Sequence, residues 1–197
     1  MIIKNYFKKY KNDLFDVLEK LDLNELSNAN NLIEKTIKRK STIYVCGNGG
    51  SHAIANHFVC DYFKGLSQDT SLNVKIKSLC SDNSLISAIS NDFSYDDVFV
   101  YQAKRYFKKN DILILISSSG NSNNIKKILN FSLKKKIKVI GITGFNGGYL
   151  KKNCNISLHC NVKNYGISED FAHILMHLIM QNIKLNNLKI NKNKAIL

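Results

Sequence analysis

The feature that most constrains this chain is a repeated order of apolar run, polar loop and helical stretch. The segment from Asp111 to Ile116 is apolar throughout after its first residue, and related runs occupy residues 42–46, 74–79, 137–142 and 156–159. Continuous apolar strands that alternate with helices are typical of a parallel sheet covered on both faces. We therefore predict an α/β fold, whose ligands bind at the carboxyl ends of the strands.

The segments around these runs have helical periodicity. Residues 1–40 are expected to form two helices that pack on the domain or on a partner subunit. Further helices are expected over residues 52–64, 83–90, 95–107, 123–135 and 168–186. The 197 residues thus divide into an N-terminal helical segment over 1–40, one α/β domain over 41–186 and a basic tail over 187–197.

The chain is strongly basic, with 29 Lys and Arg against 15 Asp and Glu. A net charge of +14 favours anionic partners such as phosphorylated metabolites or nucleic acid. The lysines are scattered, and they form neither a basic stripe nor a pattern interleaved with aromatic residues. We interpret most of them as a solvated surface and do not expect nucleic acid as a partner.

The sequence also indicates a compartment. It contains no long apolar run, so we expect neither a membrane-spanning helix nor a membrane partner. The first residues lack the apolar centre of a secretory signal. Five cysteines without Cys-x-x-Cys spacing argue against a disulfide framework and a zinc knuckle. These observations favour a reducing, cytoplasmic location.

Two loops at strand ends have residues suited to phosphorylated ligands. Gly47-Asn48-Gly49-Gly50-Ser51 lets backbone approach a ligand and starts a helix, but it also fits a tight turn that binds nothing. Ser117-Ser118-Ser119-Gly120-Asn121-Ser122 places four hydroxyls before a helix. One serine is enough for a helix cap, so the remaining hydroxyls favour a phosphate cradle.

Acidic and histidine side chains recur on two helices. His57 and Asp61 are four residues apart, and Glu169, His173 and His177 repeat the same spacing, so each set shares a helix face. Such groups can bind a divalent ion or act as general acid and base. They can equally be ordinary surface pairs, and the spacing alone does not decide between these interpretations.

Taken together, the motifs resemble the phosphoheptose isomerases, which carry a sugar isomerase (SIS) domain. The resemblance runs from about residue 5 to 186, and its motifs lie in order at residues 47–51, 57–61, 91–93, 117–122, 143–148 and 169–177. It implies a three-layer αβα sandwich with a five-stranded parallel sheet. It also implies a homotetramer with sites at subunit contacts, and a zinc ion as cofactor.

The resemblance implies conversion of sedoheptulose 7-phosphate, a phosphorylated seven-carbon sugar, to D-glycero-D-manno-heptose 7-phosphate for lipopolysaccharide or capsule. By its motifs, the substrate-binding residues are Asn48, Gly49, Gly50, Ser51, Asn91, Asp92, Ser117, Ser118, Ser119 and Ser122. The implied metal ligands are His57, Asp61, Glu169 and His177, and the implied catalytic residues are Asp61, Glu169 and His177.

Two positions depart from the pattern of the family, which usually has Glu where this chain has Asp61 and Gln where it has Glu169. The shorter Asp61 would set its reacting oxygen further back, while Glu169 adds a negative charge. Either carboxylate is a candidate base, with His177 as the acid. The alternative is a non-catalytic SIS-domain adaptor or sugar-phosphate sensor, such as a protein that binds the replication initiator.

Overall fold

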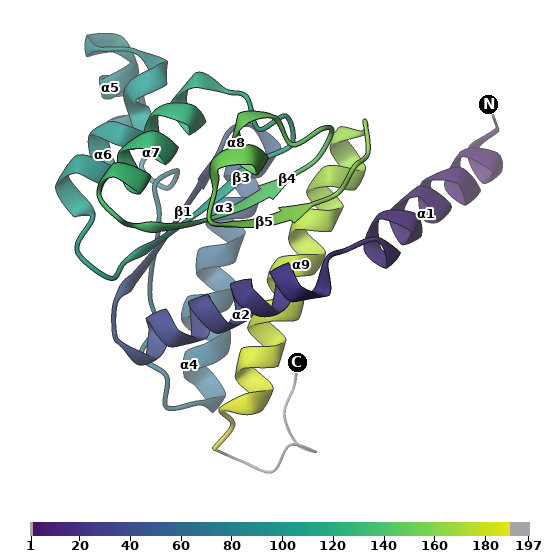
Figure 1. Ribbon diagram of the computed structural model, residues 1–197, viewed down its shortest axis with the longest axis horizontal. Helices are drawn as coiled ribbons and strands as arrows, with labels where there is room; N and C mark the ends of the chain where they lie inside the picture. Colours follow the sequence, from purple (N-terminus) through teal and green to yellow (C-terminus); the bar gives the residue numbers. More distant parts are fainter. Residues whose placement is uncertain (1, 190–197) are drawn as a thin grey trace.

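The computed structural model describes residues 2–189 and has a central sheet of five parallel strands (Figure 1). Their order across the sheet is β2-β1-β3-β4-β5. The strands are β1 (Thr42–Gly47), β2 (Lys75–Ser78), β3 (Ile112–Ser117), β4 (Lys138–Thr143) and β5 (Ile156–His159). The predicted α/β fold with a five-stranded parallel sheet is therefore confirmed.

Helices cover both faces of the sheet. One layer contains α2, α3 and α9, and the other contains α6, α7 and α8. The helices are α1 (Ile3–Glu19), α2 (Leu23–Lys38), α3 (Gly50–Cys60), α4 (Leu66–Asp69), α5 (Asn83–Asp92), α6 (Val98–Tyr106), α7 (Asn123–Lys134), α8 (Gly148–Asn153) and α9 (Tyr165–Asn186). Within residues 2–189, no helix is long and apolar enough to cross a membrane.

The core is centred on β3, whose six residues are all buried. This strand pairs with β1 on one side and β4 on the other, which explains why its sequence is apolar without alternation. The edge strand β2 begins with the exposed Lys75 and is only four residues long. The number of consecutive apolar residues in each predicted strand thus reflects whether that strand lies at the centre or at the edge of the sheet.

The two N-terminal helices differ in how they pack. Helix α2 buries Ala29, Ile33 and Ile37 against the domain, whereas Val17 is the one buried residue of α1. Helix α1 projects away from the body of the molecule (Figure 1). Its N-terminal half exposes large apolar side chains, among them Ile3 (74% exposed) and Phe7 (64%).

Several predicted helix boundaries are wrong. The predicted helix over 52–64 is α3 followed by a π-helical turn, Asp61–Gly65, and the predicted helix over 95–107 begins as a 3-10 turn, Tyr95–Asp97. Helix α9 begins at Tyr165, three residues before the predicted start. Helix α8 was not predicted, because its sequence is short and follows two glycines.

At the other end of the chain, α9 leads into a short paired segment. Leu188 forms an antiparallel bridge with Thr70, and the Lys189 amide donates to the Asp69 carbonyl over 3.1 Å. Residues 190–197 of the predicted basic tail lie outside the described residues.

Candidate functional site

The glycine loop (47–51) and the serine loop (117–122) follow β1 and β3, which are neighbours in the sheet. Both strands are parallel, so both loops lie at the same edge. The chain leaves β1 toward β2 on one side and returns to β3 on the other, which makes this point the topological switch of the sheet. Ligands of open α/β sheets bind in the crevice at such a switch.

Two paired side-chain amides join the glycine loop to the residues that follow the serine loop. Asn48 Nδ2 donates to Asn124 Oδ1 and Asn124 Nδ2 donates to Asn48 Oδ1, each over 2.9 Å. Asn124 is 1% exposed at the start of α7, and the hydroxyl of Tyr95 also donates to Asn48 Oδ1 over 3.0 Å. Sequence reasoning missed both Asn124 and Tyr95, because their role depends on contacts between distant segments.

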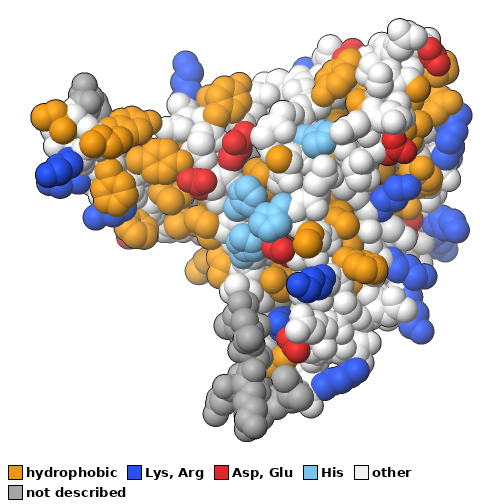
Figure 2. Space-filling view, turned by 180° about the vertical axis from the view of Figure 1, so that it is seen from behind, with side chains coloured by type: hydrophobic (Ala, Val, Ile, Leu, Met, Phe, Trp, Pro, Cys, Tyr) orange, Lys and Arg blue, Asp and Glu red, His pale blue; other side chains and the backbone are white. Residues whose placement is uncertain are grey.

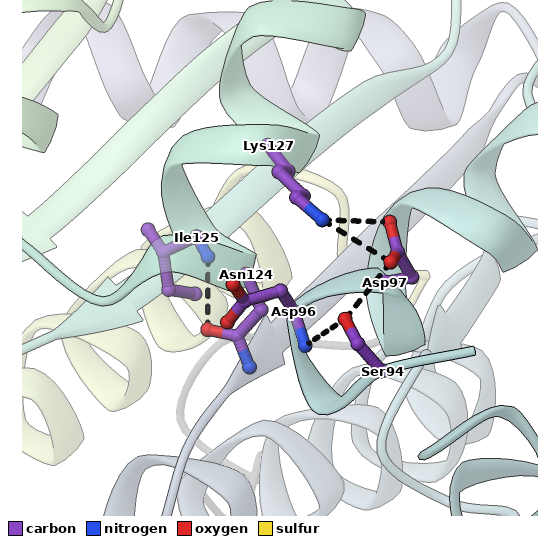
Figure 3. A network of polar contacts seen from close by, with 6 residues as sticks. All are labelled: Ser94, Asp96, Asp97, Asn124, Ile125 and Lys127. Carbon is purple, nitrogen blue, oxygen red and sulfur yellow. Dashed lines mark hydrogen bonds and ion pairs between the residues drawn. The ribbon is translucent and has the colours of Figure 1, made fainter. Parts of the chain in front are cut away.

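A second network fixes the 3-10 turn Tyr95–Asp97 through the residues on either side of Tyr95 (Figure 3). The Asp96 amide donates to Ser94 Oγ over 3.1 Å, and that hydroxyl donates to Asp97 Oδ2 over 2.9 Å. Lys127 on α7 donates to both oxygens of Asp97, at 3.0 and 3.1 Å. The Lys127 hydrogen bond, followed by the one from Ser94, lowers the pKa of Asp97. The turn that carries Tyr95 is thereby tied to the same helix as Asn124.

The serine loop is built largely by its own backbone. Gly120 donates its amide to the Ser117 carbonyl over 3.1 Å, and the Gly144 amide donates to the Ser118 carbonyl over 3.0 Å. Gly120 has a φ of 64°, and a methyl group added there would lie 2.0 Å from the Gly147 carbonyl oxygen. Ser122 precedes α7, and its side chain makes no capping hydrogen bond within the described residues. Its hydroxyl is therefore available at the start of the helix.

A hollow of about 500 Å³ opens beside the serine loop. Its lining comes from three segments: Ser119, Asn121, Phe145, Asn146, Asn161, Lys163 and Tyr165. Lys163 brings a cation next to the hydroxyls, which suits an anionic ligand. Lys163 lies in a loop without a recognisable motif, so no sequence pattern indicates its place beside the serine loop.

His57, Asp61 and His177 form a compact group of possible metal ligands. One ligand atom from each lies within 4.8 Å of the others. Asp61 Oδ1 lies 3.3 Å from His57 Nε2, and Asp61 Oδ2 lies 3.0 Å from His177 Nε2. The three side chains are 46%, 25% and 43% exposed, in that order, so a ligand can reach them. Figure 2 shows histidine side chains gathered around an acidic one on this face.

The local helix geometry explains the position of Asp61. It ends α3 and begins the π-helical turn Asp61–Gly65, after which the short α4 continues. The following Tyr62 is fully buried and donates its hydroxyl to the Met176 carbonyl over 3.3 Å. This contact fixes α3 against α9 one residue before His177. π-Helical turns are often found at functional sites.

His173 lies at the edge of this group. Its ring centroid is 5.4 Å from that of His57 and 6.2 Å from that of His177. Burial lowers the pKa of His173, and its two histidine neighbours lower it further. The helical spacing indicated this residue as a candidate, whereas the resemblance assigned it no role.

Glu169 is not part of the compact group. It lies two turns before His177 on α9, and its carboxylate reaches the glycine loop instead. A methyl group added at Gly50 would lie 2.1 Å from Glu169 Oε1, so only glycine permits this approach. The structure therefore brings together three of the four implied metal ligands and places the fourth beside the start of α3.

Asn91 and Asp92 occupy the last turn of α5 and are exposed. Asn91 Nδ2 donates to Asp92 Oδ1 over 3.0 Å, and both residues line a shallow hollow on α5 with Asn83, Ser84, Ser87 and Ala88. Helix α5 lies at the opposite side of the molecule from α1 (Figure 1). Their predicted role in sugar binding stays a prediction.

Comparison with known proteins places these features in a family. A model of the SIS domain family matches residues 5–144. The chain is 33% identical to the phosphoheptose isomerase of Buchnera aphidicola from Schizaphis graminum over 191 residues, which is 96% of this chain and 92% of the relative. It belongs to the phosphoheptose isomerase family. A Helicobacter pylori member is 34% identical over 92% of this chain and 91% of its own.

Solved structures agree with this assignment. The phosphoheptose isomerase from Neisseria gonorrhoeae superimposes with a TM-score of 0.83 at 26% identity, covering 92% of this chain and 96% of that chain. The family member from Francisella tularensis gives 0.82 at 25% identity with the same coverage. The implied family and fold are therefore confirmed.

Proposed function

We propose that this phosphoheptose isomerase interconverts sedoheptulose 7-phosphate and D-glycero-D-manno-heptose 7-phosphate, and so supplies heptose for lipopolysaccharide or capsule. The proposal is carried by one observation. A hydroxyl-rich loop and a separate cluster of His57, Asp61 and His177 are present in a chain that belongs to this family. The loop suits a phosphate, and the cluster suits proton transfer or metal binding at the reactive carbons.

The serine loop is the proposed phosphate site. Ser117, Ser118, Ser119 and Ser122 supply hydroxyls, and the start of α7 adds amides and a positive dipole end. Lys163 lines the adjoining hollow and offers a full charge. A phosphate dianion held there is bound by hydrogen bonds from fixed backbone, with little reorganisation.

The glycine loop is the proposed sugar site. Asn48, Gly49, Gly50 and Ser51 present amides and short side chains between the two strand ends. Asn48 is fixed by Asn124 and Tyr95, so its amide is oriented before a ligand arrives. Asn91 and Asp92 are proposed to contact sugar hydroxyls as well. Both are exposed on α5, so a ligand can reach them.

A divalent ion, proposed to be zinc, fits the residues of the compact group. Two imidazoles and a carboxylate within 4.8 Å of one another are the donor types found in catalytic zinc sites. His57, Asp61 and His177 would hold the ion, with Glu169 as a further ligand if its carboxylate leaves Gly50. When bound, zinc would polarise substrate oxygens and favour ionised intermediates.

The proton transfers are assigned to the chain's own groups. A base takes the proton from C1 of the open-chain ketose and returns it to C2, through an enediol. Glu169 is the better placed base, because its carboxylate faces the glycine loop while both oxygens of Asp61 lie against imidazoles. Asp61 is the alternative base. His177 is proposed to move the second proton between the two substrate oxygens, through the ring nitrogen that does not hold the ion.

A homotetramer is the proposed assembly. Helix α1 leaves the body of the molecule with Ile3, Phe7 and Phe15 exposed, and such a surface is stable in water when it is covered. Other copies of α1 would cover it. We also propose a cytoplasmic location, because all five cysteines are unpaired.

The test is a direct assay of the purified, zinc-loaded chain with sedoheptulose 7-phosphate. We expect an aldose 7-phosphate as product, and a loss of turnover of about 100-fold or more in His177→Ala. Gln181→Ala, one turn further along α9, is the matched control and should retain activity. All three proteins should have the mass of about four chains in solution.

Two outcomes contradict the proposal. An inactive wild-type protein with any heptulose phosphate would remove the enzymatic claim and favour the adaptor. Equal loss in His177→Ala and Gln181→Ala would show that the first substitution acts through the fold of α9 and not through chemistry.

A further inference from the structure

A second pocket lies at the end of the sheet opposite the glycine and serine loops. Its volume is about 610 Å³, and it reaches the first residues of β3 and β4 at Ile112 and Lys138. The serine loop begins after Ser117, at the far end of β3. A strand of six residues spans about 17 Å, so the two sites are separated by roughly the depth of the sheet.

Basic side chains dominate the rim of this pocket. They come from the end of α2, the last turn of α6 with the loop after it, the end of α7 and the start of β4: Lys35, Arg39, Lys104, Lys108, Lys109, Lys135, Lys136 and Lys138. None of these eight forms an ion pair with an acidic side chain within residues 2–189. In Figure 2, Lys and Arg side chains follow the margin of the molecule away from α1.

The one acidic residue of the pocket is already engaged by backbone. Asp111 Oδ1 accepts from the Thr42 amide over 2.8 Å, and Oδ2 accepts from the Lys108 amide over 2.7 Å. Asp111 is 5% exposed, and no described rim cation lies within ion-pair distance of it. It therefore joins β1 to the loop before β3 and does not act as a counter-ion for the exposed lysines.

Helix ends explain only part of this charge. The C-termini of α2, α6 and α7 all point to this edge of the sheet, and cations stabilise helix C-termini. Each terminus carries about half a negative charge, so three of them offset between one and two cations. Lys104 also faces Asp97 and helps to lower its pKa. With Asp111 and Asp97 included, roughly four of the eight positive charges remain without a balancing group within the described part of the chain.

The floor of the pocket is apolar, in contrast to its rim. It consists of Leu32, Phe107, Ile112, Phe131 and Ile137. Phe107 and Phe131 are half-buried, and their ring centroids lie 6.4 Å apart. An anion with a flat apolar part would cover these rings, whereas a simple inorganic anion would leave them in water.

We propose that this basic pocket binds a nucleoside polyphosphate, with its phosphates on the lysine rim and its base on the aromatic floor. The volume is within the range of pockets for small molecules. The cations converge on one hollow from four segments, whereas a duplex requires an extended basic track. The pocket is separate from the isomerase residues. A nucleoside polyphosphate bound there would regulate the enzyme or recruit it.

The experiment is a calorimetric titration of the zinc-loaded, full-length protein with ADP and, separately, with inorganic tripolyphosphate. The pocket variant carries Lys108→Glu and Lys135→Glu. The control carries Lys75→Glu and Lys134→Glu, which change the net charge equally, are exposed and lie outside the pocket lining. Lys134 is adjacent to Lys135 on the same helix end.

We expect saturable ADP binding that weakens about tenfold or more in the pocket variant and stays within about twofold in the control. Added salt should weaken it further, and tripolyphosphate should bind less tightly than ADP. Isomerase activity of both variants should equal that of the wild type, which also shows that they fold.

Three results would overturn the proposal. The absence of saturable ADP binding up to about 1 mM, or an equal loss in both variants, would reduce the pocket to a solvated basic surface. If tripolyphosphate bound as tightly as ADP, the aromatic floor of the pocket would contribute nothing to the affinity. Displacement of ADP by random-sequence duplex DNA at lower concentration would assign the surface to nucleic acid.

Discussion

At the scale of single residues, the two positions that depart from the motifs of the resemblance face different parts of the site. Asp61 lies between two imidazoles, at 3.3 and 3.0 Å, and Glu169 lies against Gly50. Asp61 is shorter than the Glu that the resemblance implies, and Glu169 carries a charge that the implied Gln lacks. These two carboxylates can therefore have separate roles. The first group can bind a metal while the second receives a proton.

This separation predicts the behaviour of Glu169→Gln, which keeps the size of the side chain and removes its charge. We expect turnover to fall about 100-fold or more, because an amide cannot accept the C1 proton. Zinc content should remain near one ion per chain, because His57, Asp61 and His177 are unchanged. Elemental analysis and a turnover assay on the same sample measure both quantities.

Glu19→Gln, which removes the same charge from an exposed side chain of α1, is the control for loss of a carboxylate. Loss of zinc from Glu169→Gln at unchanged pH would contradict the assignment and return Glu169 to the ligand set. Full activity with zinc retained would instead assign the base to Asp61.

At the scale of elements, the loops of the site depend on a small network around the 3-10 turn. Ser94, Asp97 and Lys127 join this turn to α7 (Figure 3). The turn carries Tyr95, and α7 carries Asn124, and these two side chains both contact Asn48. Disturbing the network should therefore affect both stability and the glycine loop.

The pKa of Asp97 gives this network a pH dependence. Its folded-state pKa lies below the ordinary value, so its stabilisation is present above the ordinary Asp pKa of about 4 and is lost as pH falls through the folded pKa. Asp97→Asn should lower the free energy of unfolding by about 1 kcal/mol at neutral pH, since the ion pair is partly exposed. The difference should vanish in acid, as measured by urea unfolding from pH 7 down to about pH 3.

The neighbouring Asp96→Asn is the matched control. Only the backbone amide of Asp96 contributes to the network, so this variant should unfold like the wild type. A deficit of Asp97→Asn that persisted in acid, or that Asp96→Asn shared, would show that the Lys127 pair is not its cause.

An element can be predicted from the sequence when the cause of its structure lies in its own residues. The run after Asp111 is apolar because it is buried on both faces, so its sequence alone indicates a central strand. The loops after the strands carry glycine where neighbouring backbone comes close, as at Gly47 and Gly120. By contrast, the π-helical turn at Asp61 interrupts a helical pattern without any proline, and it coincides with a long-range contact of Tyr62 with α9.

The same reasoning applies within the site. His57, Asp61 and His177 could be predicted because helical spacing and family motifs indicate them, and the structure brings them together. Asn124 and Lys163 could not, because an asparagine after a serine-rich loop and a lysine in a basic chain carry no distinct signal. Their importance arises from segments that are distant in sequence and adjacent in space.

At the scale of the whole molecule, the chain has two chemically different ends. The carboxyl edge of the sheet carries glycines, serines and the histidine group, and the amino edge carries the basic pocket. The basic residues behind the net charge of +14 are scattered in the sequence, but folding brings a part of them together in this pocket. Helix α1 adds a third feature, an apolar arm that suits contact with further copies.

The most direct measurement is a crystal structure of the zinc-loaded protein with sedoheptulose 7-phosphate, with data collected at the zinc absorption edge. We predict the phosphate on the serine loop, anomalous density beside His57, Asp61 and His177, and the C1–C2 end of the sugar directed to that density. Anomalous density away from these three side chains, or a phosphate bound outside residues 117–122, would contradict the proposed active site.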